Sequence, residues 1–149
     1  MMNAVSLMDA IIDNNLLAVE ASIADGIDIN AFPTSGHLLP LYLAIEHQRV
    51  GIVRRLIAAG ALLENELTTP GWDFGGAGWT QLVHAIDIES DAAWQAHYET
   101  GHESAELTEL LLASGAVSTK RAFEIANRYG NQKALTLLHR FAGQGLTHG

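Results

Sequence analysis

The chain repeats itself at an offset of 34 residues. Ala10 and Gly26 are 16 residues apart, Ala44 and Gly60 are also 16 apart, and the second pair follows the first by 34. Each pair encloses two short runs in which apolar residues recur at helical spacing. Helices of about ten residues with one apolar face are too short to be stable alone, so each pair needs neighbours. The period therefore predicts a stack of helix-turn-helix units.

Glycines mark where these helices are expected to stop. In the second unit Gly51 is expected to separate the two helices, and Gly60 follows the last apolar turn of the second one. Gly115 takes the same place in the third unit. A glycine just past a helix can adopt the left-handed conformation at little cost, so we expect positive φ at Gly60 and Gly115.

The units resemble the ankyrin repeat. Its opening T-P-L-H-x-A is matched in part by LPLYLA at 39–44 and by TQLVHA at 80–85, and GIDIN at 26–30 is similar to its closing G-A-D-V-N. The resemblance implies an all-α solenoid of about four repeats in one domain, 1–149, whose fingers and first helices share a concave face. The repeats are expected at about 6–38, 39–79, 80–118 and 119–142, before a loose tail at 143–149.

Two stretches depart from the period. The finger at 62–79 is long and contains the glycine-rich TTPGWDFGGAGW, which makes it a candidate functional loop. In repeat three Gly115 follows Ala85 by 30 residues instead of 16, so 14 residues are inserted between the helices, at about 89–103. We expect a lengthened first helix and a loop there. The last repeat gains basic residues, as expected of an end cap.

Composition places the chain among folded soluble proteins. It has 149 residues, 48% of them hydrophobic, and no cysteine, so it can form neither a disulfide nor a cysteine zinc site. The first residues lack the basic segment of an export signal, and no stretch is long and apolar enough for a membrane span. We therefore expect a cytoplasmic protein without a membrane partner.

Charge is unevenly distributed along the chain, whose net charge is −9. Between Leu56 and Thr119 there are ten acidic residues and no Lys or Arg, whereas Lys120–Gly149 holds five basic residues and one acid. Nucleic acids are bound mainly by neutralising phosphates, so an acidic segment excludes them as partners. A basic protein is the favoured partner, and a solvated acidic surface that only keeps the chain soluble is the alternative.

The candidate binding residues combine acids with aromatic side chains, which are favoured at interface hot spots. They lie in the long finger and in the first helix of repeat three. They are Glu64, Glu66, Trp72, Asp73, Phe74, Asp87, Glu89 and Asp91. Two other tryptophans, Trp79 and Trp94, are expected to pack against the core instead.

An enzymatic site is not indicated. Residue types that bind metals or transfer protons do gather in one segment. They are His84, Asp87, Glu89, Asp91, His97 and His102. No H-E-x-x-H motif is present, the acids at 87, 89 and 91 point around a helix, and His84 falls where the repeat expects a core position. The glycine-rich finger also lacks the Lys-Ser/Thr of a phosphate loop. We predict no catalytic residue, metal or cofactor.

The leading hypothesis is a non-enzymatic protein-binding module, monomeric without its partner. TQLVHAIDIESDAAWQ and the later TELLLASGA resemble small bacterial ankyrin proteins. Some of these are immunity proteins that bind and neutralise a toxin encoded by the neighbouring gene, which here would be basic. The alternative is a general intracellular adaptor or regulator, and a metal-dependent enzyme or small-molecule binder is the remaining one.

Overall fold

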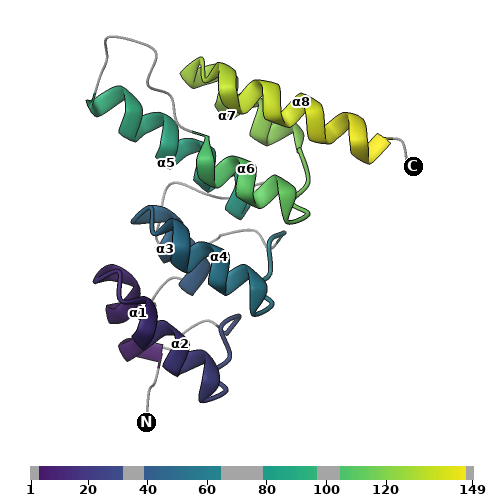
Figure 1. Ribbon diagram of the computed structural model, residues 1–149. Coiled ribbons are helices and arrows are strands. Elements are labelled where there is room, and N and C mark those ends of the chain that lie inside the picture. Colours follow the sequence, from purple (N-terminus) through teal and green to yellow (C-terminus); the bar gives the residue numbers. More distant parts are fainter. Residues whose placement is uncertain (1–3, 32–38, 65–78, 97–104, 147–149) are drawn as a thin grey trace. The chain divides into compact units, whose positions relative to one another are not determined.

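The computed structural model describes residues 4–31, 39–64, 79–96 and 105–146. Within these ranges the chain is entirely helical, without strands, as the sequence predicts (Figure 1). The helices are α1 (Ala4–Ile12), α2 (Leu16–Ala24), α3 (Pro40–Glu46), α4 (Val50–Ala58), α5 (Gln81–Ala96), α6 (Glu106–Ala113), α7 (Lys120–Tyr129) and α8 (Gln132–Leu146). None of these helices has both the length and the apolar character needed to cross a membrane. The chain divides into an N-terminal unit, Met1–Leu62, and a C-terminal unit, Leu63–Gly149.

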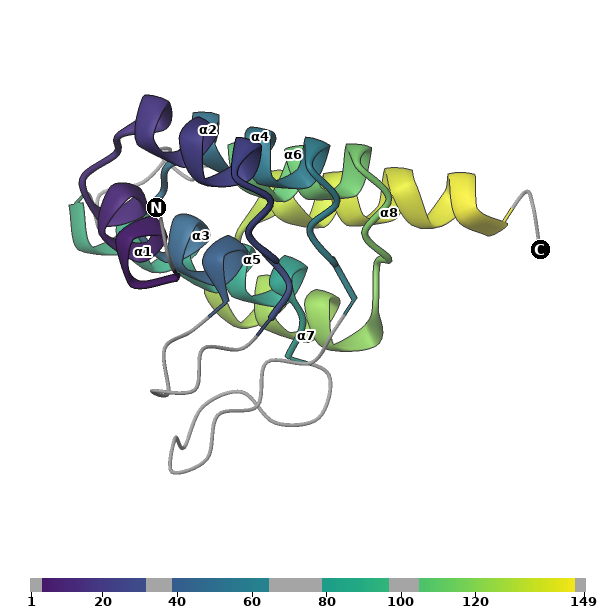
Figure 2. The same cartoon turned by 90° about the horizontal axis from the view of Figure 1, so that it is seen from below.

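The N-terminal unit consists of two helical hairpins side by side. α1 packs on α2 and α3 packs on α4, while α1 also contacts α3 and α2 contacts α4, which gives two layers (Figure 2). Apolar side chains from all four helices meet between the layers. The fully buried ones include Leu7, Ile11, Val19, Ile45, Ile52 and Leu56.

Each hairpin turn contains one residue in the left-handed conformation. Asn14 has φ of 56° and Gln48 has φ of 55°, and these two residues are 34 apart. The following amides close the turns, since Asn15 N donates to Ala10 O and Arg49 N to Ala44 O, both at 2.8 Å. The prediction that Gly51 separates the helices was wrong, because Gly51 lies inside α4. The turn needs one residue with positive φ. Gln48 adopts this conformation at some energetic cost, because it is not a glycine.

The helix stops were predicted correctly. Gly60 has φ of 101° and Gly115 has φ of 111°. Past each glycine the chain turns back to the helix, so that Ala61 N donates to Leu56 O and Ala116 N to Leu111 O, each at 3.0 Å. This is the arrangement that satisfies the last carbonyls of a helix when the residue after the cap is left-handed.

Asn30 joins the segment that follows α2 to the segment that follows α4. Its Nδ2 donates to Gly60 O at 3.1 Å, and its Oδ1 accepts from Leu62 N at 2.9 Å. The amide side chain therefore binds two backbone groups that follow the next helical hairpin. We call this pair of hydrogen bonds the Asn30 link.

The C-terminal unit has the same two-layered plan with longer helices. α5 contacts α6 and α7, and α8 contacts α6 and α7, around a core that includes Leu82, Ile86, Leu111 and Leu138. α5 has 16 residues, which agrees with the expected lengthened first helix. Glu89 and Ser90, at the start of the predicted insertion, are buried. α8 continues to Leu146, where a loose tail was predicted, and 97–104 and 147–149 lie outside the described residues.

Candidate partner-binding surface

The predicted binding residues have different structural environments. Asp87, Glu89 and Asp91 all lie on α5, and Glu64 ends the described part of the finger. Glu66, Trp72, Asp73 and Phe74 lie outside the described residues, as does the side chain of Trp94.

Asp87 and Asp91 share one side of α5, because residues four apart lie one above the other on a helix. Both are half-buried. Tyr129, the last residue of α7, is 38% exposed, and its hydroxyl donates to Asp87 Oδ1 at 2.8 Å. We call the surface formed by Asp87, Asp91 and Tyr129 the α5–α7 face.

The two carboxylates also affect the tyrosine. Burial raises the pKa of Tyr129 above its usual range, as do its hydrogen bond to Asp87 and the negative charges of Asp87 and Asp91, while Arg128 acts in the opposite direction. The phenol therefore stays protonated and remains a donor at physiological pH. The face offers two carboxylates beside an aromatic ring.

Sequence reasoning missed Tyr129, which is 42 residues from Asp87. The sequence did contain a signal for this contact. If Ala85 and Ala126 are taken as equivalent alanines of two first helices, Tyr129 is adjacent to the residue that aligns with Asp87. Since α5 and α7 are packed neighbours, their equivalent turns lie side by side. The aromatic residue beside the acids thus comes from another helix.

Glu89 corrects the predicted site, because its side chain is only 2% exposed and cannot meet a partner. Its Oε2 accepts from Leu107 N at 2.7 Å, and its Oε1 accepts from Thr108 N at 3.0 Å and Thr108 Oγ1 at 2.7 Å. α6 starts after Ala105, which has no capping side chain. Glu89 therefore caps α6 from α5, and its negative charge suits the N-terminus of a helix.

Glu64 is exposed but also has a structural contact. Its Oε1 accepts from Val117 N at 2.9 Å. Glu64 follows Asn30 by 34 residues, and Val117 occupies the place after Gly115 that Leu62 occupies after Gly60. Glu64 thus repeats the accepting half of the Asn30 link.

His84 and Trp79 belong to the interior, as predicted. Burial lowers the pKa of His84 to about 3, so its imidazole is neutral at physiological pH.

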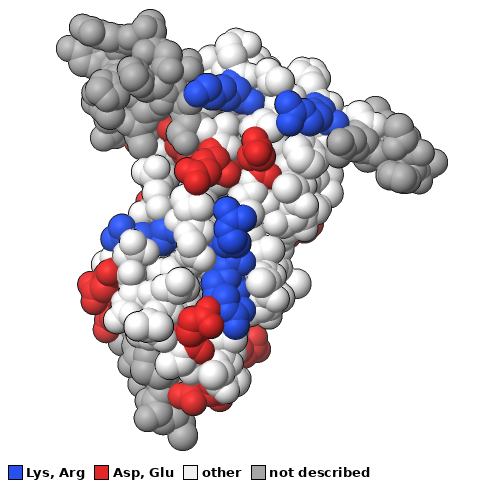
Figure 3. Space-filling view, in the orientation of Figure 1, with Lys and Arg blue, Asp and Glu red and all other residues white. Residues whose placement is uncertain are grey.

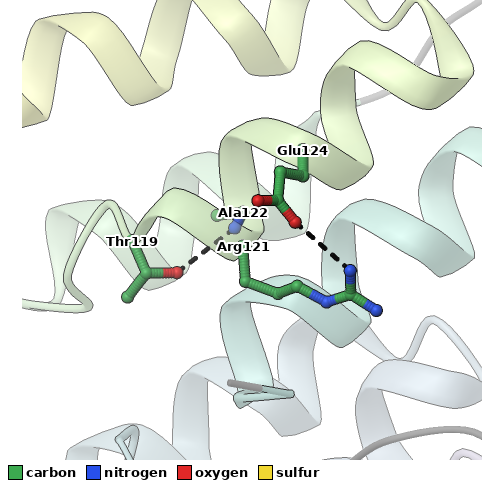
Figure 4. A network of polar contacts seen from close by, with 4 residues as sticks. All are labelled: Thr119, Arg121, Ala122 and Glu124. Atoms are coloured by element: carbon green, nitrogen blue, oxygen red, sulfur yellow. Dashed lines mark hydrogen bonds and ion pairs between the residues drawn. The ribbon is translucent and has the colours of Figure 1, made fainter. Parts of the chain in front are cut away.

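Trp79 is buried, with the guanidinium carbon of Arg121 5.8 Å from its ring centroid. Arg121 also reaches Glu124 at 3.3 Å, while Thr119 caps α7 by accepting from Ala122 N at 3.2 Å (Figure 4). The Trp79 ring thus lies beside the Arg121 side chain of α7.

A metal centre has no support in the described parts of the chain, where no three His, Asp or Glu side chains converge on a point that could hold an ion. Glu89 is already occupied by three donors. The other two histidines that were considered, His97 and His102, lie outside the described residues.

Acidic and basic segments meet in the C-terminal unit. Figure 3 shows acidic side chains over α6 and basic ones over α8, and these helices pack against each other. The exposed residues are Glu106 and Glu109 on α6 and Lys133 and Arg140 on α8. The described acidic residues thus do not form one uniform acidic surface. Among them, Asp87 and Asp91 on the α5–α7 face have an aromatic neighbour in Tyr129.

Comparison of the chain with protein-family models and with curated proteins finds no match.

Proposed function

We propose that this protein is a non-enzymatic protein-binding module of the ankyrin type that holds a basic partner on its α5–α7 face. The repeated backbone geometry supports the architecture. The left-handed turn residues, the glycine stops and the links made by Asn30 and Glu64 recur at equivalent positions, although the residue types differ. Such recurrence is typical of a stacked repeat.

One observation carries the proposed binding mode, the hydrogen bond between Tyr129 and Asp87. It holds an aromatic ring beside two carboxylates that share one side of α5. An arginine fits this chemistry best, because its guanidinium can pair with a carboxylate through two hydrogen bonds and lie over an aromatic ring. A basic protein that presents an arginine or lysine is therefore the proposed ligand.

The most specific role consistent with this chemistry is immunity. The protein would bind a basic toxin encoded by a neighbouring gene and neutralise it, as some small bacterial ankyrin proteins do. An intracellular adaptor that binds a basic protein would use the same face. The two roles differ in the consequence of losing the protein.

A genetic experiment separates them. If deleting this gene stops growth only while the adjacent reading frame is intact, and if a plasmid copy restores growth, the immunity role is supported. Normal growth of the deletion strain in the presence of an intact, expressed neighbour would overturn it and favour the adaptor.

A binding experiment tests the α5–α7 face with the product of the adjacent frame as the ligand. Replacing Asp87 and Asp91 with Asn should lower the association rate and its dependence on salt, because complementary charge mainly accelerates encounter. The matched control replaces Glu106 and Glu109 with Gln, which removes the same amount of charge from exposed positions on α6. Equal rates for the two double variants would contradict the proposed face.

A further inference from the structure

α2 has an unusual surface for a helix at the outside of a unit. Its sequence LLAVEASIA contains one charged residue, Glu20, and apolar residues occur around the whole circumference. Val19 and Ser22 face the interior, while Leu17, Ala21 and Ala24 are exposed at the i, i+4, i+7 spacing of one helix side. Leu17 is 83% exposed. This side of α2 thus exposes a large apolar side chain, that of Leu17, to water.

The fold does not require an outer helix to expose apolar side chains in this way. In α4, the equivalent helix 34 residues later, Gly51 and Arg55 stand where α2 has Leu17 and Ala21. Arg54 of α4 is exposed, and Arg55 forms an ion pair with Glu20. The side of α4 that corresponds to Leu17 and Ala21 thus carries a charged residue, whereas this side of α2 carries none.

Two more apolar side chains border the turn that leads into α2. Leu16 is 43% exposed and Ile12, the last residue of α1, is 41% exposed. We call the surface formed by Ile12, Leu16, Leu17, Ala21 and Ala24 the α2 face. A contiguous exposed apolar surface is a common sign of an interaction site.

Acidic residues lie at both ends of the α2 face. Asp13 is exposed at the turn before α2, and Asp25 and Asp28 are exposed after its last residue. Of the three Arg residues of the unit, Arg55 pairs with Glu20 and Arg49 donates to Ile12 O, while Arg54 is exposed on α4. The two ends of the α2 face therefore carry negative charge.

We propose that the α2 face docks an amphipathic helix of another protein, with an apolar stripe flanked by Lys or Arg. A helix suits the dimensions, since α2 has nine residues and is about 13 Å long. The small side chains of Ala21 and Ala24 allow a second helix to approach closely, while Leu17 provides the apolar anchor. This is the helix-on-helix mode of peptide recognition, and positive flanks would meet Asp13 at one end and Asp25 and Asp28 at the other.

The same acids argue against a second copy of this chain. In a parallel pair of α2 helices Asp13 would face Asp13, and in an antiparallel pair Asp13 would approach Asp25 and Asp28 of the other copy. Like charges juxtaposed across an interface are unfavourable in both arrangements. An anionic lipid surface is disfavoured for the same reason.

The test uses the full chain and two synthetic peptides of about 15 residues, enough for four helical turns. Both peptides carry leucines at helical spacing, one with lysines and the other with glutamates at the flanking positions. Fluorescence anisotropy should show binding of the lysine peptide and not of the glutamate peptide. Leu17→Gln should weaken binding by about tenfold or more, because a buried leucine contributes at least that much.

Matched variants separate this surface from others. Leu62→Gln changes another exposed leucine of the same unit and should leave the affinity unchanged. The Asp87→Asn and Asp91→Asn double variant removes the acids of the α5–α7 face, which would also attract lysines. The loss of affinity caused by Leu17→Gln should persist in that background, so the two faces are tested independently.

Three results would overturn the proposal. They are equal affinity of Leu17→Gln and wild type for the lysine peptide, a Leu17-dependent dimer in sedimentation, or Leu17-dependent binding to vesicles containing phosphatidylserine without peptide binding. Circular dichroism and urea unfolding check that Leu17→Gln remains folded, as expected for an exposed position.

Discussion

Glu89 accepts hydrogen bonds from both the backbone amide and the hydroxyl of Thr108, at 3.0 and 2.7 Å. The two residues are 19 apart in the sequence, yet their contact fixes the N-terminus of α6 to α5. The contact is buried, where hydrogen bonds to a charged group are strongest and an unpaired donor is most costly. Glu89 thus holds the two helices together irrespective of the segment between them.

Glu89→Ala should lower the free energy of unfolding by about 3 kcal/mol, because it leaves buried amide and hydroxyl donors of α6 without an acceptor. Urea unfolding followed by circular dichroism measures the change. Glu109→Ala, an exposed change on α6, should cost less than about 0.5 kcal/mol. Similar effects of the two substitutions would show that Glu89 does not cap α6.

Asn30→Ala should destabilise the N-terminal unit by about 1 to 2 kcal/mol, since it removes one donor and one acceptor from the Asn30 link. Asn30→Asp keeps the acceptor for Leu62 N but places a carboxylate oxygen against Gly60 O, so it should cost at least as much. Thermal unfolding of both variants measures these effects. Wild-type stability of Asn30→Ala would show that the Asn30 link does not stabilise the unit.

Two glycines of the same unit should respond in opposite directions to alanine. Gly60 has positive φ, where a Cβ is strained, so Gly60→Ala should cost about 1 kcal/mol. Gly51 lies inside α4 with open space around its Cα, so Gly51→Ala should stabilise the protein by about 0.5 kcal/mol. Chemical unfolding midpoints measure both effects, and shifts of equal sign would contradict the observed backbone conformations.

His84 should make the fold sensitive to acid. Burial lowers the pKa of His84 from 6.5 in the unfolded chain to about 3, so the unfolded state binds the proton first as the pH falls. Its contribution to stability is complete above pH 6.5 and is lost as the pH falls from there towards 3, by at most about 1.4 kcal/mol per pH unit.

The measurement is the free energy of unfolding between about pH 6.5 and 5, above the range in which most carboxylates titrate. His84→Gln should flatten this dependence, and His47→Gln, at an exposed position, should not. An unchanged slope in His84→Gln would mean that another group causes the loss.

Backbone features governed by local sequence were largely predictable. The 34-residue offset and the apolar spacing gave the helical pairs, and glycine after the last apolar turn predicted the stops at Gly60 and Gly115. The exception was Gly51, where the rule that glycine interrupts a helix failed. α4 tolerates Gly51 as one exposed glycine. The turn is formed instead by Gln48, and its residue type does not predict a left-handed conformation.

Side-chain roles that depend on distant residues were not predictable in the same way. Glu89 appeared as one of several acids on a helix, and only the packing of α5 on α6 reveals that its carboxylate faces the start of α6. Tyr129 went unnoticed because its partner Asp87 lies on another helix. The shared side of Asp87 and Asp91 could have been predicted from their spacing of four residues, although the sequence analysis grouped them with Glu89 as acids that point around a helix.

The Asn30 link has a consequence for how the first helical hairpin opens. Within the N-terminal unit α1 and α2 pack against one other hairpin, and elements with few packed neighbours are among the first to exchange their amide hydrogens with solvent. Here α1 and α2 are connected to the next hairpin by Asn30, by Arg55 with Glu20 and by Arg49 with Ile12 O. Opening the first hairpin must break all three connections together. The amide of Leu62, although it lies outside any helix, should therefore exchange in the same cooperative event as the amides of α2.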